Sequence, residues 1–579
     1  MSLKSVVMCL NRRSLLLSSS AAVGLFSLGA VGIWAKSASG TTEPIPYDDS
    51  FPKLPIGMNL SGIADWEPGF PFKNLFLGAR AWLTRNMSGG GPWDTKVQEI
   101  FEYDQNGYPL EVPVSAGLDE LQTIFTMVPN VRTPGRYVLL YDGEGEIDGL
   151  LGTKVLKRSP GRLLLQMTHD PNGRAEAIVI KRSIRGNHIR NIRLVAEEHA
   201  DDDLDKDPFL PEFLDFCRPF HCLRFMDWGG TNNSLQETWS DRKHPTFYTM
   251  VAKGGDADGK WGPPPTPFAR KFAGGVAYEY MIQLCNMLKV DMWVCIPHRA
   301  DDDYIAHLAR LVKHSLDPAL KAYVEFSNEI WNWQFHQAGW MLQSPLAGSL
   351  VEAKGGFPWR NSDRTDGKDH PERIGALFRR AFSIWEREWS EESHRMIRVC
   401  SVQVGWPDTA KRTIRWCMDH GGVDVVSPTA YFGPSKEHYR KWATAGGDLT
   451  ADMVIDDMFE VLREQREGSK LSEVVAFGRS LGLPYVAYEG GQHIQPEKQT
   501  ELPYKPALDA AQMHPRMADL YLELIRIHRD LGCKMLAHFS SVGRQGTRWG
   551  SWGAKATYAQ RDEDSPKMRT LLACNIART

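Results

Sequence analysis

From about residue 205 onward, short apolar stretches alternate with longer segments of helical period. The short stretches are rich in β-branched and aromatic residues, which is typical of buried strands. One intervening segment, residues 301–314, places four apolar side chains on one helix face: Ile305, Leu308, Leu311 and Val312. We predict seven strands in this part of the chain, at 222–228, 291–297, 322–328, 396–404, 423–431, 484–490 and 534–540.

An eighth strand is predicted at 56–61, with a helix at 73–86 after it. Eight strand–helix units in one chain predict an α/β fold of the (β/α)8 TIM-barrel type, whose first unit spans 55–100. An open, doubly wound sheet is the alternative. It is disfavoured because no glycine-rich phosphate loop follows any predicted strand.

Residues 101–200 have a different pattern. Short runs that alternate between apolar and polar residues are separated by Pro-Gly, Asp-Pro-Asn-Gly and Arg-Gly-Asn turns. This pattern predicts an all-β, sandwich-like module inserted after the first barrel unit, with residues 201–579 forming the rest of the barrel. The connection 229–268 is longer than a simple loop requires, and we expect it to shape the cleft at the barrel mouth.

The N-terminal 38 residues are typical of an export signal. Arg12 and Arg13 precede an uncharged, apolar segment that runs from residue 14 to residue 35. This arrangement resembles a bacterial twin-arginine signal, followed by a linker at 39–54, and predicts a periplasmic or secreted protein. The alternative is an uncleaved N-terminal helix that anchors the protein, since the apolar segment is long enough to span a bilayer.

Composition excludes some partners and favours others. The 579 residues carry a net charge of −3 without a basic stripe, so no nucleic-acid partner is expected. No stable membrane partner is expected once the signal has been cleaved. The 19 tryptophans exceed what a core requires and suit the stacking of flat apolar faces such as sugar rings.

Cysteines and acidic runs are two further features that bear on disulfides and metal sites. The nine cysteines form no Cys-x-x-Cys pair and lie mostly in apolar segments, which favours buried thiols, although a Cys217–Cys222 bridge remains open. The acidic runs at 201–207 and 299–304 lack the spacing of a calcium loop, and the second is placed to begin a helix. No metal or other cofactor is predicted.

Polar residues cluster where the predicted barrel strands end. In a barrel of this type the carboxyl ends of the strands form the active face. Glu329 and Glu489 occupy matching places at the ends of two strands, 160 residues apart. Hydrolysis of an acetal needs two carboxyl groups, one protonated and one ionised. The acid of such a pair needs a raised pKa at neutral pH, which an aromatic pocket can supply, and Trp331 and Trp333 are suitable walls for such a pocket.

The alternation of the strand before Glu329 supports its placement. Period two puts Tyr323, Glu325, Ser327 and Glu329 on one side, facing the barrel axis. Glu325 then lies deeper in the barrel, where burial demands a partner, and we predict a structural role for it.

Two motifs carry a resemblance to a known family. The segments "FSNE" (326–329) and "AYEGG" (487–491) resemble the signatures of clan A, or 4/7 superfamily, retaining glycoside hydrolases. The chain also resembles secreted bacterial barrel proteins that are sometimes labelled cellulose-binding. The resemblance implies Glu329 as the general acid/base and Glu489 as the nucleophile.

The same resemblance implies roles for further residues. Asn328 would hold the sugar 2-hydroxyl, and Arg224 and Tyr431 would bind the nucleophile. His298 and Trp552 would line the sugar that is cleaved. Position alone adds four more candidate substrate-binding residues: Asn59, Trp228, Trp331 and His493.

The sequence therefore predicts an exported retaining glycoside hydrolase that acts on a β-linked poly- or oligosaccharide by double displacement, without a cofactor. The alternative is a carbohydrate-binding barrel protein without turnover, in which the β-module is the binding unit.

Overall fold

The computed structural model describes residues 51–115, 117–129, 134–168, 176–252, 266–354, 369–466, 468–497, 502–547 and 550–578. The predicted export signal at 1–38, most of the linker and Cys9 lie outside these residues. None of the described helices is long and apolar enough to cross a membrane.

The barrel is a closed ring of parallel strands. The strands follow one another around the ring in chain order, and β14 pairs with both β13 and β16, which closes it. β14 and β15 share the sixth position, because β14 pairs with β13 and β15 continues the pairing with β16. The strands are β1 (Ile56–Asn59), β10 (Cys222–Arg224), β11 (Asp291–Ile296), β12 (Ala322–Phe326), β13 (Met396–Ser401), β14 (Val425–Ser427), β15 (Ala430–Phe432), β16 (Tyr485–Gln492) and β17 (Cys533–His538).

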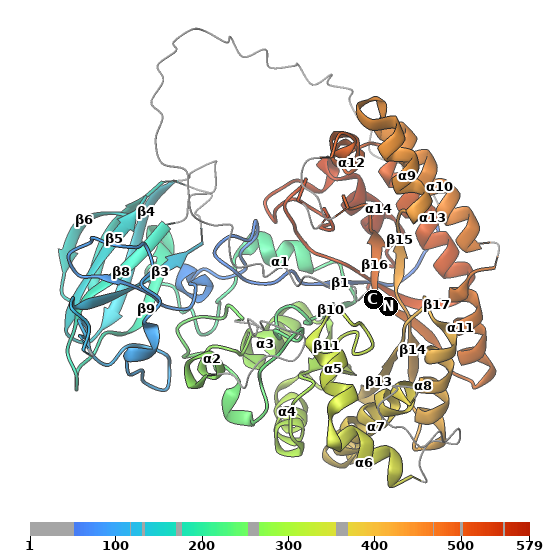
Figure 1. Cartoon of the computed structure of the whole chain (residues 1–579), viewed down its shortest axis with the longest axis horizontal. Coiled ribbons are helices and arrows are strands. Elements are labelled where there is room, and N and C mark those ends of the chain that lie inside the picture. Colours follow the sequence, from blue (N-terminus) through green and yellow to red (C-terminus); the bar gives the residue numbers. More distant parts are fainter. Residues whose placement is uncertain are drawn as a thin grey trace, which may run out of the picture. The chain divides into compact units, whose positions relative to one another are not determined.

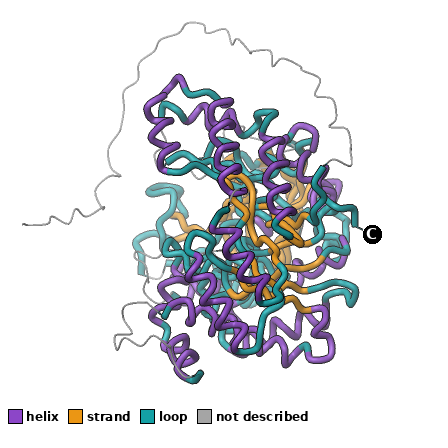
Figure 2. The backbone as a smooth tube through the Cα atoms, turned by 90° about the vertical axis from the view of Figure 1, so that its right-hand side faces the viewer, coloured by secondary structure: helices purple, strands orange, loops and turns teal. Residues whose placement is uncertain are grey.

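All eight predicted barrel strands are therefore confirmed, and so is the TIM-barrel fold. Their residues are almost entirely buried, as expected for parallel strands that are covered on both sides. Helices lie outside the strands (Figure 2).

The helices that alternate with the strands are labelled in Figure 1. They are α1 (Pro211–Cys217), α2 (Pro267–Lys271), α3 (Tyr278–Leu288), α4 (Asp302–Ser315), α5 (His336–Gln343), α6 (Pro345–Glu352), α7 (His370–Glu388), α8 (Pro407–Asp419), α9 (Lys436–Ala445), α10 (Ala451–Arg466), α11 (Lys470–Ser480), α12 (Lys505–Ala511), α13 (Met517–Asp530) and α14 (Pro566–Cys574).

Two acidic runs have structural roles. The side chain of Asp301 accepts the backbone N–H of Tyr304 and begins α4, as predicted. In the run 201–207, Asp202 and Asp207 both accept hydrogen bonds from the buried Lys73 ammonium, at 2.8 and 2.5 Å. The run is thus held by a lysine that would otherwise be an unpaired buried charge.

The inserted module consists of two four-stranded antiparallel sheets, in orders β2-β3-β8-β5 and β6-β7-β4-β9. Apolar residues from both sheets, such as Ile124, Ile178, Leu139 and Leu165, belong to one core. This arrangement matches the predicted sandwich-like module. Its strands are β2 (Leu83–Asn86), β3 (Gln122–Val128), β4 (Gly135–Asp142), β5 (Gly145–Leu151), β6 (Lys154–Ser159), β7 (Arg162–Met167), β8 (Glu176–Ser183) and β9 (Arg190–Ala196).

The helix predicted at 73–86 is wrong. Leu75–Gly78 forms only a short 3-10 turn, and Leu83–Asn86 is strand β2, paired with β3. The module's first sheet therefore begins at Leu83, before the predicted boundary at residue 101. Tertiary pairing with β3 overrides the local helical periodicity of this segment.

The cysteine arrangement yields a test of the fold. All eight described cysteines are free and buried, including Cys217 and Cys222, so no disulfide contributes to the described part of the chain. Burial also raises the pKa of both thiols, which lowers their reactivity.

We expect these eight thiols to stay unreactive toward a colorimetric disulfide reagent in the native protein and to react fully in denaturant. The midpoint of thermal unfolding should be the same with and without reductant. A midpoint that falls on reduction would contradict the free-thiol assignment.

Candidate active site

Glu489 lies near the carboxyl end of β16 and is held by two donors. The guanidinium Nη1 of Arg224 donates to Oε1 at 2.7 Å, and the Tyr431 hydroxyl donates to Oε2 at 3.1 Å. The two donors come from different parts of the ring: Tyr431 from β15, which pairs with β16, and Arg224 from β10, which is separated from β16 by β1 and β17. Glu489 is only 5% exposed, so these bonds replace most of its hydration.

A β-bulge positions Glu489 together with the residue before it. Ala487 pairs with Leu536 and Gly490 with His538, so β16 has one residue more than β17 in this interval. The extra residue breaks the alternation of side chains. Tyr488 therefore lies inside the barrel as well, where its ring stacks under the Arg224 guanidinium at 5.0 Å.

Glu329 is held by two donors of its own. The Tyr488 hydroxyl donates to Oε1 at 2.8 Å, and the Asn332 amide donates to Oε2 at 2.7 Å. The backbone N–H of Asn332 also bonds the Glu329 carbonyl, which closes a tight turn directly after β12. Glu329 is partly exposed, whereas Asn328 beside it is buried.

The backbone at the end of β12 is strained. Ser327 has φ of 65° and Glu329 has φ of 40°, in the left-handed region that non-glycine residues rarely adopt. Strain of this kind is tolerated where surrounding contacts fix the conformation, and it concentrates at functional sites. Here it ends the strand alternation at Phe326, so that both Asn328 and Glu329 point to the site.

Arg224 is the hub of the site and is fully buried. Besides Glu489, it donates to Glu325 Oε2, to Asn59 Oδ1 and to Asn328 Oδ1, each at 2.9 Å. Glu325 also accepts the Trp293 indole N–H at 2.9 Å. The predicted structural role of Glu325 as a deep, partnered carboxylate agrees with these contacts.

Asn59 and Asn328 support this hub. The Asn59 amide donates to the Tyr488 carbonyl at 2.9 Å and so connects β1 to β16. The Asn328 amide donates to Asn232 Oδ1 at 3.1 Å, and the Gln337 amide donates to the same oxygen at 2.7 Å. Asn232 belongs to the long connection after β10, whose described part thus reaches the site as expected.

Electrostatics make Glu489 unusual. Burial raises the pKa of its carboxyl to about 8, and the nearby Glu329 carboxylate adds to the rise, while Arg224 acts in the opposite direction. One guanidinium faces two buried carboxylates, Glu325 and Glu489, so the cluster binds a proton readily. Protonation of Glu329 removes its repulsion and lowers the pKa of Glu489.

Aromatic residues surround Glu489 on the side of the eighth strand. The Tyr431 ring lies 5.3 Å from His493, and the Trp552 ring lies 5.6 Å from His493 and 5.5 Å from Phe539. Among the described residues the buried Trp552 Nε1 has no hydrogen-bond partner. An unpartnered N–H donor of this kind is suited to donate a hydrogen bond to a sugar hydroxyl.

His298 is placed at the end of β11 but is 2% exposed. Burial lowers the pKa of its imidazole to about 3, so the ring is neutral. Its edge packs against Trp340 at 5.4 Å, and its Nδ1 has no partner within the described chain.

Two tryptophans proposed from position do not face the site. Trp228 is 1% exposed, stacks on Phe213 at 5.8 Å and donates its indole N–H to the Ser61 carbonyl. Trp331 is 5% exposed and packs edge-on against Tyr488 at 6.4 Å. Trp228 therefore belongs to the core, and Trp331 is a wall behind Tyr488 and has no exposed face for a substrate.

Sequence reasoning missed two residues of the site, Tyr488 and Asn332. Tyr488 precedes the predicted nucleophile, and period two places it on the helix side. Asn332 could have been identified from the sequence, because an asparagine three residues after Glu329 can hydrogen-bond to Glu329 and close a turn.

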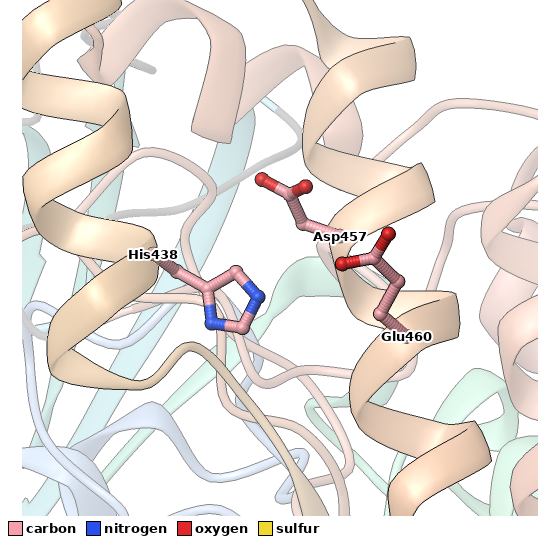
Figure 3. A group of neighbouring side chains, drawn as sticks. All are labelled: His438, Asp457 and Glu460. Carbon is pink, nitrogen blue, oxygen red and sulfur yellow. The ribbon is translucent and has the colours of Figure 1, made fainter.

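One group among the described residues has metal-binding geometry. The ligand atoms of His438, Asp457 and Glu460 lie within 4.8 Å of one another, between α9 and α10 (Figure 3). Asp457, however, already accepts hydrogen bonds from the Lys441 ammonium and from the Trp442 indole. His438 Nδ1 is engaged by Ser435 at the start of α9. These contacts identify a link between two helices, with a lysine as its cation.

Removal of the buried Arg224 guanidinium should destabilise the folded protein. We expect Arg224→Met to lower the free energy of unfolding by about 3–5 kcal/mol, because it leaves Glu325 and Glu489 buried without a counter-charge. The double variant Arg224→Met/Glu325→Gln should recover part of this loss. Denaturant unfolding monitored by fluorescence measures both.

Arg516→Met is the matched control, since Arg516 is an exposed arginine that pairs with Asp452 and Asp456. It should cost less than about 1 kcal/mol. Equal losses for the two arginine variants would contradict the central role of Arg224.

Comparisons with known proteins were made by sequence and by structure. No family model and no curated protein matches the sequence. By structure the chain is similar to a broad-specificity endoglucanase of Clostridium acetobutylicum, at 9% identity and a TM-score of 0.31, over 65% of this chain and 92% of that one. It is similar to xylanase 10C of Cellvibrio japonicus at 10% identity and a TM-score of 0.32, over 86% and 97% of the two chains.

A third similar structure is a calcium-binding mutant of β-glucuronidase 2 from Bacteroides uniformis, at 12% identity and a TM-score of 0.28. The match covers 79% of this chain and 49% of that one, so the chain spans about half the length of that protein. Because these likenesses are distant, the fold assignment depends on the strand pairing described above, and the site is interpreted from its own geometry.

Proposed function

We propose that the protein is a retaining glycoside hydrolase that cleaves O-glycosidic bonds in a β-linked poly- or oligosaccharide. The observation that carries this proposal is the pairing of Glu329 and Glu489 at the mouth of the barrel. Each carboxylate accepts a hydrogen bond from a tyrosine hydroxyl, and of these two carboxylates only Glu489 also accepts one from the buried Arg224 guanidinium. Two carboxyl groups in different environments are what acetal hydrolysis requires.

In the first step Glu489 attacks the anomeric carbon of the sugar. A bond forms between a Glu489 carboxylate oxygen and this carbon while the bond to the leaving oxygen breaks. The Glu329 carboxyl gives its proton to that oxygen. Arg224 and Tyr431 hold the two oxygens of Glu489, so that the remaining lone pairs face the substrate.

In the second step water releases the sugar. The Glu329 carboxylate takes a proton from water as the water oxygen attacks the anomeric carbon, and the ester bond to Glu489 breaks. The hydroxyl of Tyr488 suits both states of Glu329, because it donates to the carboxylate and can accept from the protonated acid.

The electrostatic coupling between the two carboxylates favours keeping one proton on the pair. Glu329 repels the negative charge on Glu489, so placing the proton on Glu329 assists the ionisation of Glu489. A desolvated carboxylate is also a strong nucleophile, because water does not stabilise its charge.

The location of the activity follows from the sequence alone. We infer that the protein acts outside the cytoplasm, from the twin-arginine-like segment at residues 1–38. Fractionation of the producing cells, compared with an Arg12→Lys/Arg13→Lys variant, tests this step.

The main test is hydrolysis of a panel of β-linked glucans, xylans and mannans. We expect Glu329→Gln and Glu489→Gln each to lose at least about a thousandfold in kcat/KM, since each removes one half of the acid–nucleophile pair. Glu212→Gln, a change of an exposed glutamate on α1, is the matched control and should retain full activity.

Equal activity in all of these proteins would end the catalytic assignment. Retention of a polysaccharide without any turnover by the wild type would identify a binding protein instead.

The pH profile provides an independent test. The first step needs a proton on Glu329 and a charge on Glu489. The pKa of about 8, which the ionised Glu329 helps to raise, marks the loss of the last proton from the pair, so kcat/KM should fall as the pH rises through about 8. Tyr431→Phe removes a donor to the ionised form and should move this limb to higher pH. An alkaline limb centred near pH 4.5, the ordinary value for glutamate, would contradict the desolvated nucleophile.

A further inference from the structure

Four tryptophans of the described chain are about half exposed, and two of them lie together at the barrel mouth. Trp333 is 49% exposed and Trp406 is 57% exposed. Trp333 follows β12 and Trp406 follows β13, which are paired neighbours in the ring. The remaining two lie elsewhere, Trp66 after β1 and Trp93 beside Phe125 of the module.

The two tryptophans are joined by one ring into a row. The centroid of the His370 ring lies 6.1 Å from that of Trp333 and 6.3 Å from that of Trp406. Both contacts are edge-type, at an interplanar angle of 61°. The row therefore crosses the ends of strands β12 and β13 and the start of α7. We call Trp333, His370 and Trp406 the aromatic row.

The row begins directly beside the proposed acid. Trp333 follows Asn332, whose amide and backbone N–H both bond Glu329. The turn that fixes the Glu329 carboxyl thus also fixes the backbone of Trp333. From this turn on β12 the row leads toward the neighbouring strand β13.

The surroundings of the row are polar. Asp369 and Asp408 lie close to His370 and Trp406 in the sequence, and the Lys470 ammonium donates to the Gly405 carbonyl at 2.8 Å. The turn 332–335 contributes an asparagine and a glutamine, and the segment 403–406 contributes a glutamine and a glycine. Large exposed aromatic faces next to amide groups suit the flat apolar faces and the hydroxyls of neutral sugars. Exposed apolar side chains that gather at a site mark a binding surface, because leaving them in water is unfavourable.

Because the row lies next to the proposed acid, the role of Glu329 determines which part of the substrate contacts the row. Glu329 protonates the leaving oxygen, so the leaving group extends past Glu329 toward Trp333. We propose that the aromatic row binds the sugars of the leaving group, and that the substrate is therefore a polysaccharide chain cut with several sugars beyond the cleaved bond. This inference rests on the proposed hydrolysis for its direction and on the row itself for its binding.

Two substrates separate the row from the catalytic pair. The first is the polysaccharide of the panel that the wild type cleaves best. The second is the glycosyl fluoride of the same sugar, whose leaving group is a single atom that cannot reach the row. We expect Trp333→Ala and Trp406→Ala each to lower kcat/KM for the polysaccharide relative to kcat/KM for the fluoride by about tenfold, because each change removes one stacking contact.

Trp93→Ala is the matched control, because Trp93 is 48% exposed but lies in the module. It should leave the ratio unchanged. Binding is measured separately by gel retardation of the Glu489→Gln protein in polysaccharide-containing native gels, with and without each tryptophan change.

The outcomes distinguish this inference from the proposed function. An unchanged ratio in both row variants overturns the row while hydrolysis stands. Retardation that depends on Trp333 and Trp406, in a protein whose wild type cleaves nothing, keeps the row and overturns hydrolysis. Cleavage of the fluoride without cleavage or retention of any polysaccharide overturns the row. Retardation lost only in Trp93→Ala moves the carbohydrate site to the module and overturns it as well.

Discussion

A single buried guanidinium organises the mouth of this barrel. Arg224 is 0% exposed and contacts Glu325, Glu489, Asn59 and Asn328. A fully buried charge is tolerated only where every donor has a partner, so this one residue constrains four side chains on or directly after three strands, β1, β12 and β16. The proposed nucleophile is one of them, and its position follows from the need to satisfy Arg224.

This constraint explains why two glutamates with the same side chain lie in different environments. Glu489 is buried and receives the guanidinium, whereas Glu329 is partly exposed and receives only neutral donors. Their environments, and not their residue type, assign the two roles. The closed parallel ring fixes both strand ends in space, which brings residues 160 positions apart to one site.

Much of this arrangement could be predicted from the sequence, because it follows from periodicity. The strand positions and the sandwich-like module follow from repeating patterns, whereas the contacts of Arg224 and Tyr431 with Glu489 are implied by the family resemblance. The predictions that failed concern residues where the repeating pattern is interrupted. Trp228 follows a strand whose chain turns into the core, and Leu83–Asn86 becomes a strand only through its partner β3. Period two also hides Tyr488, because a bulge reverses its direction.

The same bulge ties the two halves of the site together mechanically. Tyr488 holds one carboxylate and Glu489 is the other, and these residues share a peptide bond. Any sliding or tilting of β16 therefore moves the anchor of Glu329 and the carboxyl of Glu489 as one body. The spacing between the two carboxyl groups thus depends on the position of this one dipeptide in β16.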